Sequence, residues 1–275
     1  MLSTAIIIFR EVLEIALVLT VLLAATRALR GGARLTWIGV VLGTVASVIV
    51  AYFAKAISSA AEGMGQELFN AIILSLAAVL IIWHVVWMSK HGREMARHFQ
   101  EVGQSVSHGE KPLYMLSVVM AVAVLREGSE IVLFMYGLFV QGVSATEAIV
   151  GGLLGLAGAV LTGTALYYGM LKISPKRLFS ITSWLLVLLA AGMVSQAVGF
   201  LSAAGWVPEL VSPLWDMSAI LSEHGLAGRI LHTLLGYSER PSGAQVLAYL
   251  MTIGVVIVLL RWFGNSSSGA GGKRK

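Results

Sequence analysis

Apolar residues dominate the chain in seven long runs, which short polar segments separate. The runs cover about 2–25, 36–54, 68–88, 113–140, 148–171, 180–204 and 243–263. Each is close to the ~20 residues that an α-helix needs to cross the hydrocarbon core of a bilayer. They lack the alternating segments of about ten residues that are typical of membrane β-barrels. The pattern therefore predicts an all-α polytopic membrane protein with seven transmembrane helices.

Two of these runs contain the same group of ionisable residues. The first run holds Arg10-Glu11-Val12-Leu13-Glu14, and the fourth holds Arg126-Glu127-Gly128-Ser129-Glu130. A charged side chain at the centre of a lipid-facing helix costs roughly 2.5–3.5 kcal/mol on insertion scales. Such residues are retained where they face one another, a cavity or an ion. The two R-E-x-x-E motifs therefore mark the candidate site.

Composition agrees with a membrane protein. The 275 residues are 57% hydrophobic and 12% charged, whereas soluble domains carry about 25% charged residues. The absence of cysteine excludes disulfides and thiolate metal sites. The net charge of +5 comes from basic residues that lie mostly between the apolar runs, so we interpret them as topology signals rather than as a nucleic-acid surface.

The distribution of Lys and Arg predicts the orientation. Fourteen of these residues fall in the segments on one side of the membrane and three on the other. The positive-inside rule then places the N-terminus outside and the C-terminus in the cytoplasm, in the cytoplasmic (inner) membrane. No cleavable signal peptide is expected, because Met1 to Ile8 contains no basic region.

Orientation also suggests an inverted repeat. The first and fourth spans run in opposite directions, carry the same motif, and are each followed by two further spans. We expect residues 1–263 to form a permease domain with one repeat in spans one to three, a second repeat over 113–204, and an extra span at 243–263. Transporters of this design bind substrate at the midplane. Residues 264–275 are expected to form a flexible cytoplasmic tail.

The segment 205–241 is the longest one predicted on the outer side. Apolar residues recur there at roughly helical spacing from Leu214 to Leu231 among charged residues. We expect an amphipathic helix on the outer surface, broken at Gly225. A re-entrant segment at the outer mouth is the alternative.

Each motif places its two carboxylates on one helix face, because positions i and i+3 are neighbours on a helix. If the two helices face each other, Glu11, Glu14, Glu127 and Glu130 converge beside Arg10 and Arg126, with a formal charge of −2. Carboxylate oxygens are ligands for Ca²⁺, Mg²⁺, Mn²⁺ and, by extension, Fe³⁺. Neither motif supplies Cys, Met or His, which disfavours a copper(I) or zinc site.

The chain resembles the oxidase-dependent iron permeases, a family of bacterial and fungal high-affinity ferric iron transporters. The resemblance rests on both motifs, the seven-span arrangement, and Gly236-Tyr237 with Pro241-Ser242 before the last span, and it covers nearly the whole chain. It implies that the four motif glutamates are the metal ligands, with the two arginines as supporting partners. The common family form is R-E-G-x-E, and here Val12 replaces the glycine of the first copy.

The resemblance also implies partners and a cargo. The cargo is an iron ion, expected as Fe³⁺, with no permanently bound cofactor. Periplasmic iron-binding, peroxidase-like or oxidase proteins are implied partners, besides membrane lipid, and no nucleic acid is expected. The remaining alternatives are transport of another cation (Fe²⁺, Mn²⁺ or Pb²⁺), a di-metal membrane oxidase, which the missing Glu-x-x-His pairs disfavour, and a non-transporting docking subunit.

Four further positions carry hypotheses. Glu62 and Glu67 are candidates for cation recruitment at the outer mouth, with simple interfacial charge as the alternative. His84 is assigned to the inner membrane interface rather than to a metal site. Gln196 is expected to form an interhelical hydrogen bond. The histidines of the predicted loop 90–111 are expected in solvent.

Overall fold

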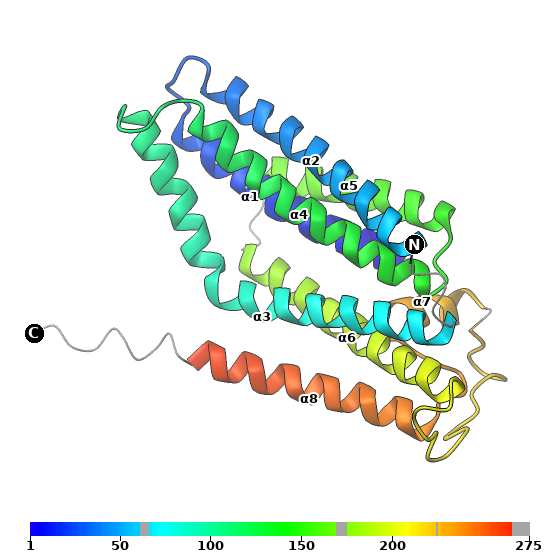
Figure 1. The fold of residues 1–275 in the computed structure, drawn as a ribbon. Helices are drawn as coiled ribbons and strands as arrows, with labels where there is room; N and C mark the ends of the chain where they lie inside the picture. The colour runs from blue at the N-terminus through cyan, green and yellow to red at the C-terminus, as the bar shows by residue number, and fades with distance from the viewer. Residues whose placement is uncertain (61–65, 169–174, 224, 266–275) are drawn as a thin grey trace, which may run out of the picture.

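The computed structural model describes residues 1–60, 66–168, 175–223 and 225–265 (Figure 1). These residues form eight α-helices, and no β-strand occurs among them. The helices are α1 (Leu2–Ala25), α2 (Gly32–Ala60), α3 (Gln66–Ser107), α4 (Met115–Val140), α5 (Ala145–Tyr167), α6 (Pro175–Ala203), α7 (Leu226–Leu235) and α8 (Gly243–Asn265). The predicted all-α membrane protein is confirmed. Glu62 and the tail beyond residue 265 lie outside the described residues.

Five of the described helices are long and apolar enough to cross a membrane. They are α2, α3 over Gln66–Gly92, α5, α6 over Phe179–Ala203, and α8. Each of α1 and α4 carries three ionisable motif residues within five positions, which is more charge than the apolar stretches of these five helices contain. Both are nevertheless longer than the ~20 residues of a transmembrane helix.

The apolar residues fall into an interior set and an outward set. The outward faces of α2, α5 and α8 expose large apolar side chains, including Val48, Leu161 and Val258. Exposed apolar faces of this size suit contact with lipid rather than water. The bundle therefore has a lipid-type exterior around a buried centre.

Two apolar clusters fill that centre. The larger one joins α1, α3, α4, α6 and α8 and includes Ile7, Phe134 and Leu138. The smaller one joins α1, the end of α3 and the start of α4 and includes Leu22 and Met120. Along both α1 and α4, the motif residues lie between the two clusters. The charged groups are therefore enclosed between two apolar cores.

Helix α3 differs from the prediction. The sequence placed a solvated loop at 90–111, but the helix continues to Ser107. Figure 1 shows α3 changing direction about midway, so that its second half approaches the end of α1. There Gly103 lies against Ala25, and Val106 joins the smaller apolar cluster. The apolar run ends at the polar residues after Ser89. The helix nevertheless continues, because its second half packs on α1.

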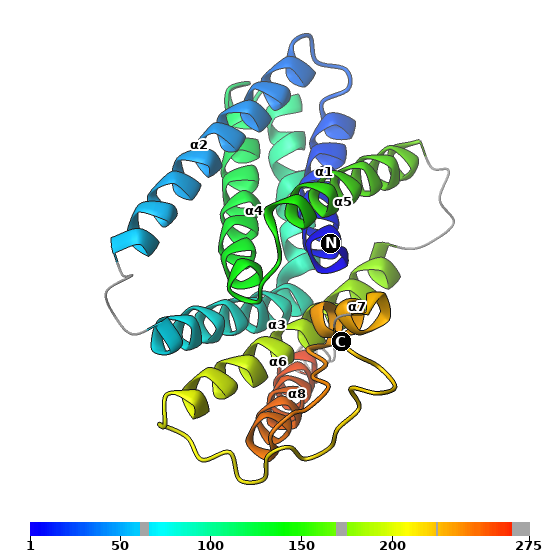
Figure 2. The ribbon, with the colours of Figure 1, turned by 90° about the vertical axis from the view of Figure 1, so that its right-hand side faces the viewer.

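The segment 204–223 contains turns rather than the expected helix from Leu214. Only α7, which follows Gly225, is helical, and it packs on α6. α7 ends at Gly236, whose φ of 67° is left-handed. Gly236 and Gly192 of α6 approach so closely that a side chain on either would overlap the other backbone. Figure 1 shows this segment on the same, right-hand side as the N-terminus, and Figure 2 shows it beside α6 and α8.

Candidate functional site

The two motifs face each other across the contact between α1 and α4, and α3 closes the third side. Arg10, Glu11 and Glu14 are buried on α1, and Glu127 is buried on α4. Helical spacing explains the shared face, because residues three and four apart are neighbours. Glu11, Glu127 and Glu130 of the two motifs therefore lie close together, with Glu14 beside them.

The α1 motif is tightly paired. Arg10 Nη1 donates to Glu11 Oε1 at 2.8 Å, and Arg10 Nη2 lies 3.1 Å from Glu14 Oε1. The arginine is only 1% exposed. One guanidinium thus holds both carboxylates of its own helix within the protein interior.

The α4 motif is paired more loosely. Arg126 Nε lies 3.4 Å from Glu130 Oε1 and 3.7 Å from Glu127 Oε1. The Arg126 side chain is 30% exposed, and its guanidinium lies 4.3 Å from the centre of the Trp87 ring on α3. The same motif therefore has two different environments in the two halves of the chain.

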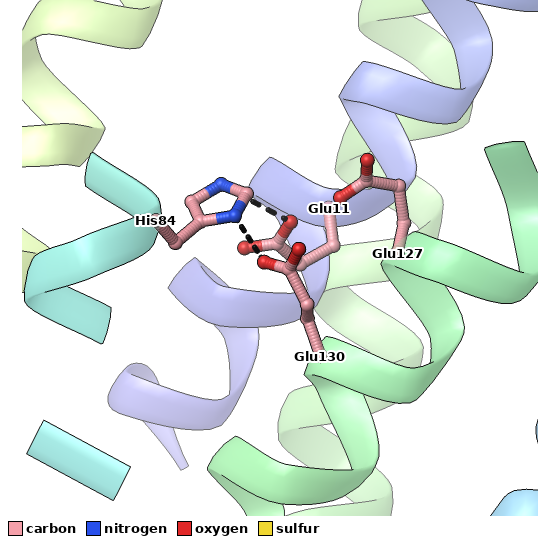
Figure 3. A group of neighbouring side chains, drawn as sticks. All are labelled: Glu11, His84, Glu127 and Glu130. Atoms are coloured by element: carbon pink, nitrogen blue, oxygen red, sulfur yellow. Dashed lines mark ion pairs between the residues drawn. The ribbon is translucent and has the colours of Figure 1, made fainter. Parts of the chain in front are cut away.

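His84 of α3 lies between the two motifs, so its assignment to the inner interface is wrong (Figure 3). The residue is 3% exposed. Its Nδ1 contacts Glu130 Oε2, and its Nε2 lies 3.7 Å from Glu14 Oε1 and 3.9 Å from Glu11 Oε2. The sequence carries a signal that was overlooked, since His84 is the one ionisable residue between Glu67 and Lys90.

Four of these side chains could hold a metal ion. Glu11, His84, Glu127 and Glu130 each offer a ligand atom, and these atoms lie within 4.8 Å of one another. Oε2 of Glu11 and Oε2 of Glu127 are buried without a hydrogen-bond partner among the described residues, and Oε2 of Glu130 contacts His84 Nδ1. A buried carboxylate oxygen without a donor is costly, and a cation would supply the missing interaction. Glu14 lies next to this group and is held by Arg10.

Two cavities adjoin the cluster. One has a volume of about 590 Å³ and is bordered by Arg10, Glu14 and Glu127, then by largely apolar residues of α1, α3, α6 and α8. The other has a volume of about 370 Å³ and is bordered by His84, Arg126 and Glu130, together with Trp83 and Trp87. The first extends along α1 toward its C-terminal end, and the second extends along α4 toward its C-terminal end. The cluster therefore lies between two cavities that extend away from it along different helices.

The remaining predicted residues lie elsewhere. Glu67 is exposed in the first turn of α3 and does not join the cluster. Gln196 Nε2 lies 2.8 Å from His232 Nε2, which is the interhelical hydrogen bond expected for it. His232 Nδ1 lies 2.7 Å from the carbonyl oxygen of Tyr237. Since a carbonyl only accepts, Nδ1 donates and Nε2 accepts from Gln196.

The acidic residues of the 205–241 segment fix its own conformation. Glu223 and Glu239 each accept a hydrogen bond from the backbone N–H of the other, at 2.9 and 2.8 Å. Asp216 accepts from the Ser218 hydroxyl at 2.6 Å and pairs with Arg240 at 3.0 Å. These partners, the Ser218 hydrogen bond first, lower the pKa of Asp216 to about 2. None of the three belongs to the buried cluster.

Comparison with known proteins gives the same picture. The model of the Iron permease FTR1 family matches residues 1–264. The chain is 33% identical over 248 residues to the Ferrous iron permease EfeU of Escherichia coli O6:H1 (strain CFT073), covering 89% of this chain and 90% of that protein. It is 29% identical over 267 residues to the Ferrous iron permease EfeU of Yersinia pestis, covering 96% and 94%. No solved structure matches the chain.

Proposed function

Because the chain belongs to the iron permease FTR1 family, we propose that it carries iron across the cytoplasmic membrane into the cell through the cluster on α1, α3 and α4. It is a multi-pass membrane transporter and not an enzyme. One observation carries the proposed path: buried ligand atoms from three helices meet between two cavities. The proposed ligands are Glu11, Glu14, Glu127 and Glu130.

We propose α1 and α4 as the sixth and seventh membrane spans. Their charged motif residues keep both helices out of a count of spans by composition. These residues face the interior of the bundle, where each arginine pairs with glutamates of its own motif rather than facing lipid. The cost of charge in a membrane helix is reduced in this way. Residues 1–263 then form one permease domain, and residues 264–275 form its tail.

The packing of glycines supports the inverted repeat. Gly39 and Gly43 of α2 lie against the carbonyls of Ser117 and Ala121 on α4. In the other half, Gly151 and Gly155 of α5 lie against the carbonyls of Met1 and Ala5 on α1. The offset from Met1 to Ser117 and from Ala5 to Ala121 equals the offset from Arg10 to Arg126. Thus α2 packs on α4 at the positions where α5 packs on α1.

The residues that line the two cavities are also related by a constant offset in residue number. Their linings contain residues of α1 and α4 at one constant offset: Arg10 and Arg126, Glu14 and Glu130, Leu17 and Leu133, Val18 and Phe134. They also contain residues of α3 and α6 at a second constant offset: Leu80 and Ser180, Trp83 and Ser183, His84 and Trp184, Trp87 and Val187. Two repeats of opposite orientation would place equivalent cavities on opposite sides of the membrane.

We therefore propose that the two cavities are the outer and inner vestibules of one path. With the N-terminus outside, the 370 Å³ cavity faces the outside and the 590 Å³ cavity faces the cytoplasm. A cation that enters the cluster relieves the repulsion among its carboxylates. Rocking of the two three-helix repeats would then expose the cluster to one vestibule at a time, with a continuous gated path as the alternative.

The oxidation state of the iron has two candidates. The resemblance to the ferric iron permeases led us to expect Fe³⁺, whereas the two similar EfeU proteins are named ferrous iron permeases. Other divalent cations, Mn²⁺ and Pb²⁺, are further candidates. Periplasmic iron-binding, peroxidase-like or oxidase proteins are proposed partners that would deliver the metal at the outer vestibule.

Uptake of radioactive iron into proteoliposomes tests the proposal. Iron is supplied as an Fe³⁺ chelate or as Fe²⁺ with ascorbate, and the purified wild type is compared with Glu11→Gln and Glu127→Gln. Glu67→Gln is the matched control, because Glu67 is exposed and outside the cluster. We expect uptake by the wild type and the control, and background uptake by the two cluster variants.

The form of iron that the wild type takes up faster, Fe³⁺ or Fe²⁺, identifies the oxidation state of the substrate. Normal uptake by both cluster variants would overturn the assigned path. If the wild type transports neither form, even with periplasmic extract added, iron transport by this protein is refuted.

A further inference from the structure

The search for chemistry beyond the motif glutamates leads to His84. It is the nitrogen ligand within the described cluster, and neither R-E-x-x-E motif contains it. The imidazole comes from α3, which carries no motif. We propose that His84 is a metal ligand of the transport site and that it selects iron as a divalent transition-metal ion against Mg²⁺ and Ca²⁺. This inference rests on the proposed function.

Burial is the first argument. The His84 side chain is 3% exposed, although an imidazole without partners is costly to bury. Its two ring nitrogens make no hydrogen bond of normal geometry within the described residues. Both nevertheless face carboxylates: Nδ1 faces Glu130 of α4, and Nε2 faces Glu11 and Glu14 of α1. The ring is therefore directed into the cluster from the side that the motifs leave open.

The geometry is compatible with a ligand role for His84. Each motif pairs its two glutamates with one arginine, Arg10 or Arg126, so the four carboxylates keep a formal charge of −2 that a bound cation would offset. A ligating histidine usually donates its second ring N–H to a carboxylate, which orients the ring. Here either nitrogen can bind the ion while the other points toward a glutamate. This arrangement matches a ligand with its orienting partner already in place.

The chemistry of the donor set gives the selectivity. Mg²⁺ and Ca²⁺ prefer oxygen ligands, whereas imidazole suits iron and other first-row transition metals. Four glutamates alone would accept alkaline-earth ions, which are hard cations. One imidazole among them adds affinity for Fe²⁺ and little for Mg²⁺ or Ca²⁺. Fe³⁺ is harder and gains less from nitrogen, so the ligand set favours the ferrous form.

The second repeat does not duplicate this ligand. The position of α6 that corresponds to His84 in the cavity linings is Trp184. The site thus has carboxylates from both halves and an imidazole from one half. A purely structural residue in the repeat would have no reason to provide a nitrogen donor at this place alone.

Pulsed EPR on the detergent-solubilised full chain with bound Mn²⁺ tests the ligand directly. We expect electron spin echo modulation from ¹⁴N in the wild type, replaced by a ¹⁵N pattern when histidine is ¹⁵N-labelled. His84→Gln should abolish this nitrogen signal and raise the apparent Kd for Mn²⁺ at least about tenfold. Substitution of residues that only orient a metal ligand already weakens metal binding by this factor. His91→Gln is the matched control, since His91 lies on the same helix and stacks on Trp87.

The selectivity is tested by ⁵⁵Fe²⁺ uptake in the presence of excess Mg²⁺ or Ca²⁺. We expect these ions to compete weakly in the wild type and strongly in His84→Glu, which replaces nitrogen by oxygen. Absence of nitrogen modulation in the wild type, or its persistence in folded His84→Gln, would overturn the proposal. If Mn²⁺ shows the histidine signal but the wild type takes up no iron, the permease function fails while the ligand assignment stands.

Discussion

Arg10 and Arg126 occupy the same motif position, yet the structure predicts very different costs for their removal. Arg10 is 1% exposed and pairs with Glu11 at 2.8 Å and Glu14 at 3.1 Å. Breaking a buried ion pair by removing one partner costs about 3–5 kcal/mol, because the remaining charge stays buried. We expect Arg10→Gln to lose stability in this range.

Arg126→Gln should cost much less. Its side chain is 30% exposed, and its shortest carboxylate distance is 3.4 Å. Partly exposed pairs contribute about 0–1 kcal/mol, and the contact with Trp87 adds about 0.5–1 kcal/mol. The two identical substitutions should therefore differ by at least about 1 kcal/mol in unfolding free energy.

Thermal unfolding of the purified variants in detergent, followed by size-exclusion chromatography, measures this difference. With about 2–4 °C per kcal/mol for a chain of this size, Arg10→Gln should lower the Tm by about 6–20 °C and Arg126→Gln by less than about 8 °C. The double variant Arg10→Gln/Glu14→Gln should recover part of the loss, because it removes a stranded carboxylate. Equal Tm losses for the two arginine variants would refute the reasoning.

Three further predictions follow from packing, access and pKa. Gly43→Leu should prevent folding, because even a Cβ at Gly43 would lie 2.6 Å from the Ala121 carbonyl oxygen, whereas Gly254→Leu, in open space, should yield normal amounts of folded protein. In the cysteine-free chain, Ser183→Cys should react with an impermeant thiol reagent only from the cytoplasmic side and Leu133→Cys only from the outside; labelling of both from one side would contradict the two vestibules. The ¹³C resonance of Asp216, the one aspartate of the chain, should titrate near pH 2, and Ser218→Ala should raise the pH of this titration. The ionised carboxylate stabilises the folded state above about pH 4. This stabilisation is lost as the pH falls through the native pKa of about 2.

Hydropathy predicts the long helices well, because each apolar run overlaps a helix of the structure. It fails where a helix leaves the apolar region. The second half of α3 is polar enough to suggest a loop, but it is helical since Val106 and Gly103 pack on the end of α1. The turns before α7 show the reverse case, in which spaced apolar residues after Leu214 do not form a helix. Tertiary contacts decide both, and periodicity does not report them.

The candidate site divides in the same way. Six of its residues are recognisable from sequence, because charges inside apolar runs are rare and the motif occurs twice. His84 is also an ionisable residue inside an apolar run, but it lies near the expected end of that run, where polar residues are common, and it was therefore assigned to the interface. The different burial of Arg10 and Arg126 could not be predicted, because the two motifs are alike. Arg126 contacts Trp87 and Met95 of α3, whereas Arg10 is enclosed with the two glutamates of its own helix.

The unequal vestibules show how such neighbours act. At equivalent positions the larger cavity has Val18 and Ser183 where the smaller has Phe134 and Trp83. Bulky aromatic rings occupy space that small side chains leave open, and the cavity with these two rings is the smaller one, at 370 Å³ against 590 Å³. Under the proposed inverted repeat, different side chains at equivalent positions would give the proposed path a narrower end and a wider end. Under the proposed orientation the ion meets the narrow end first, beside His84, where selection among cations has its greatest effect.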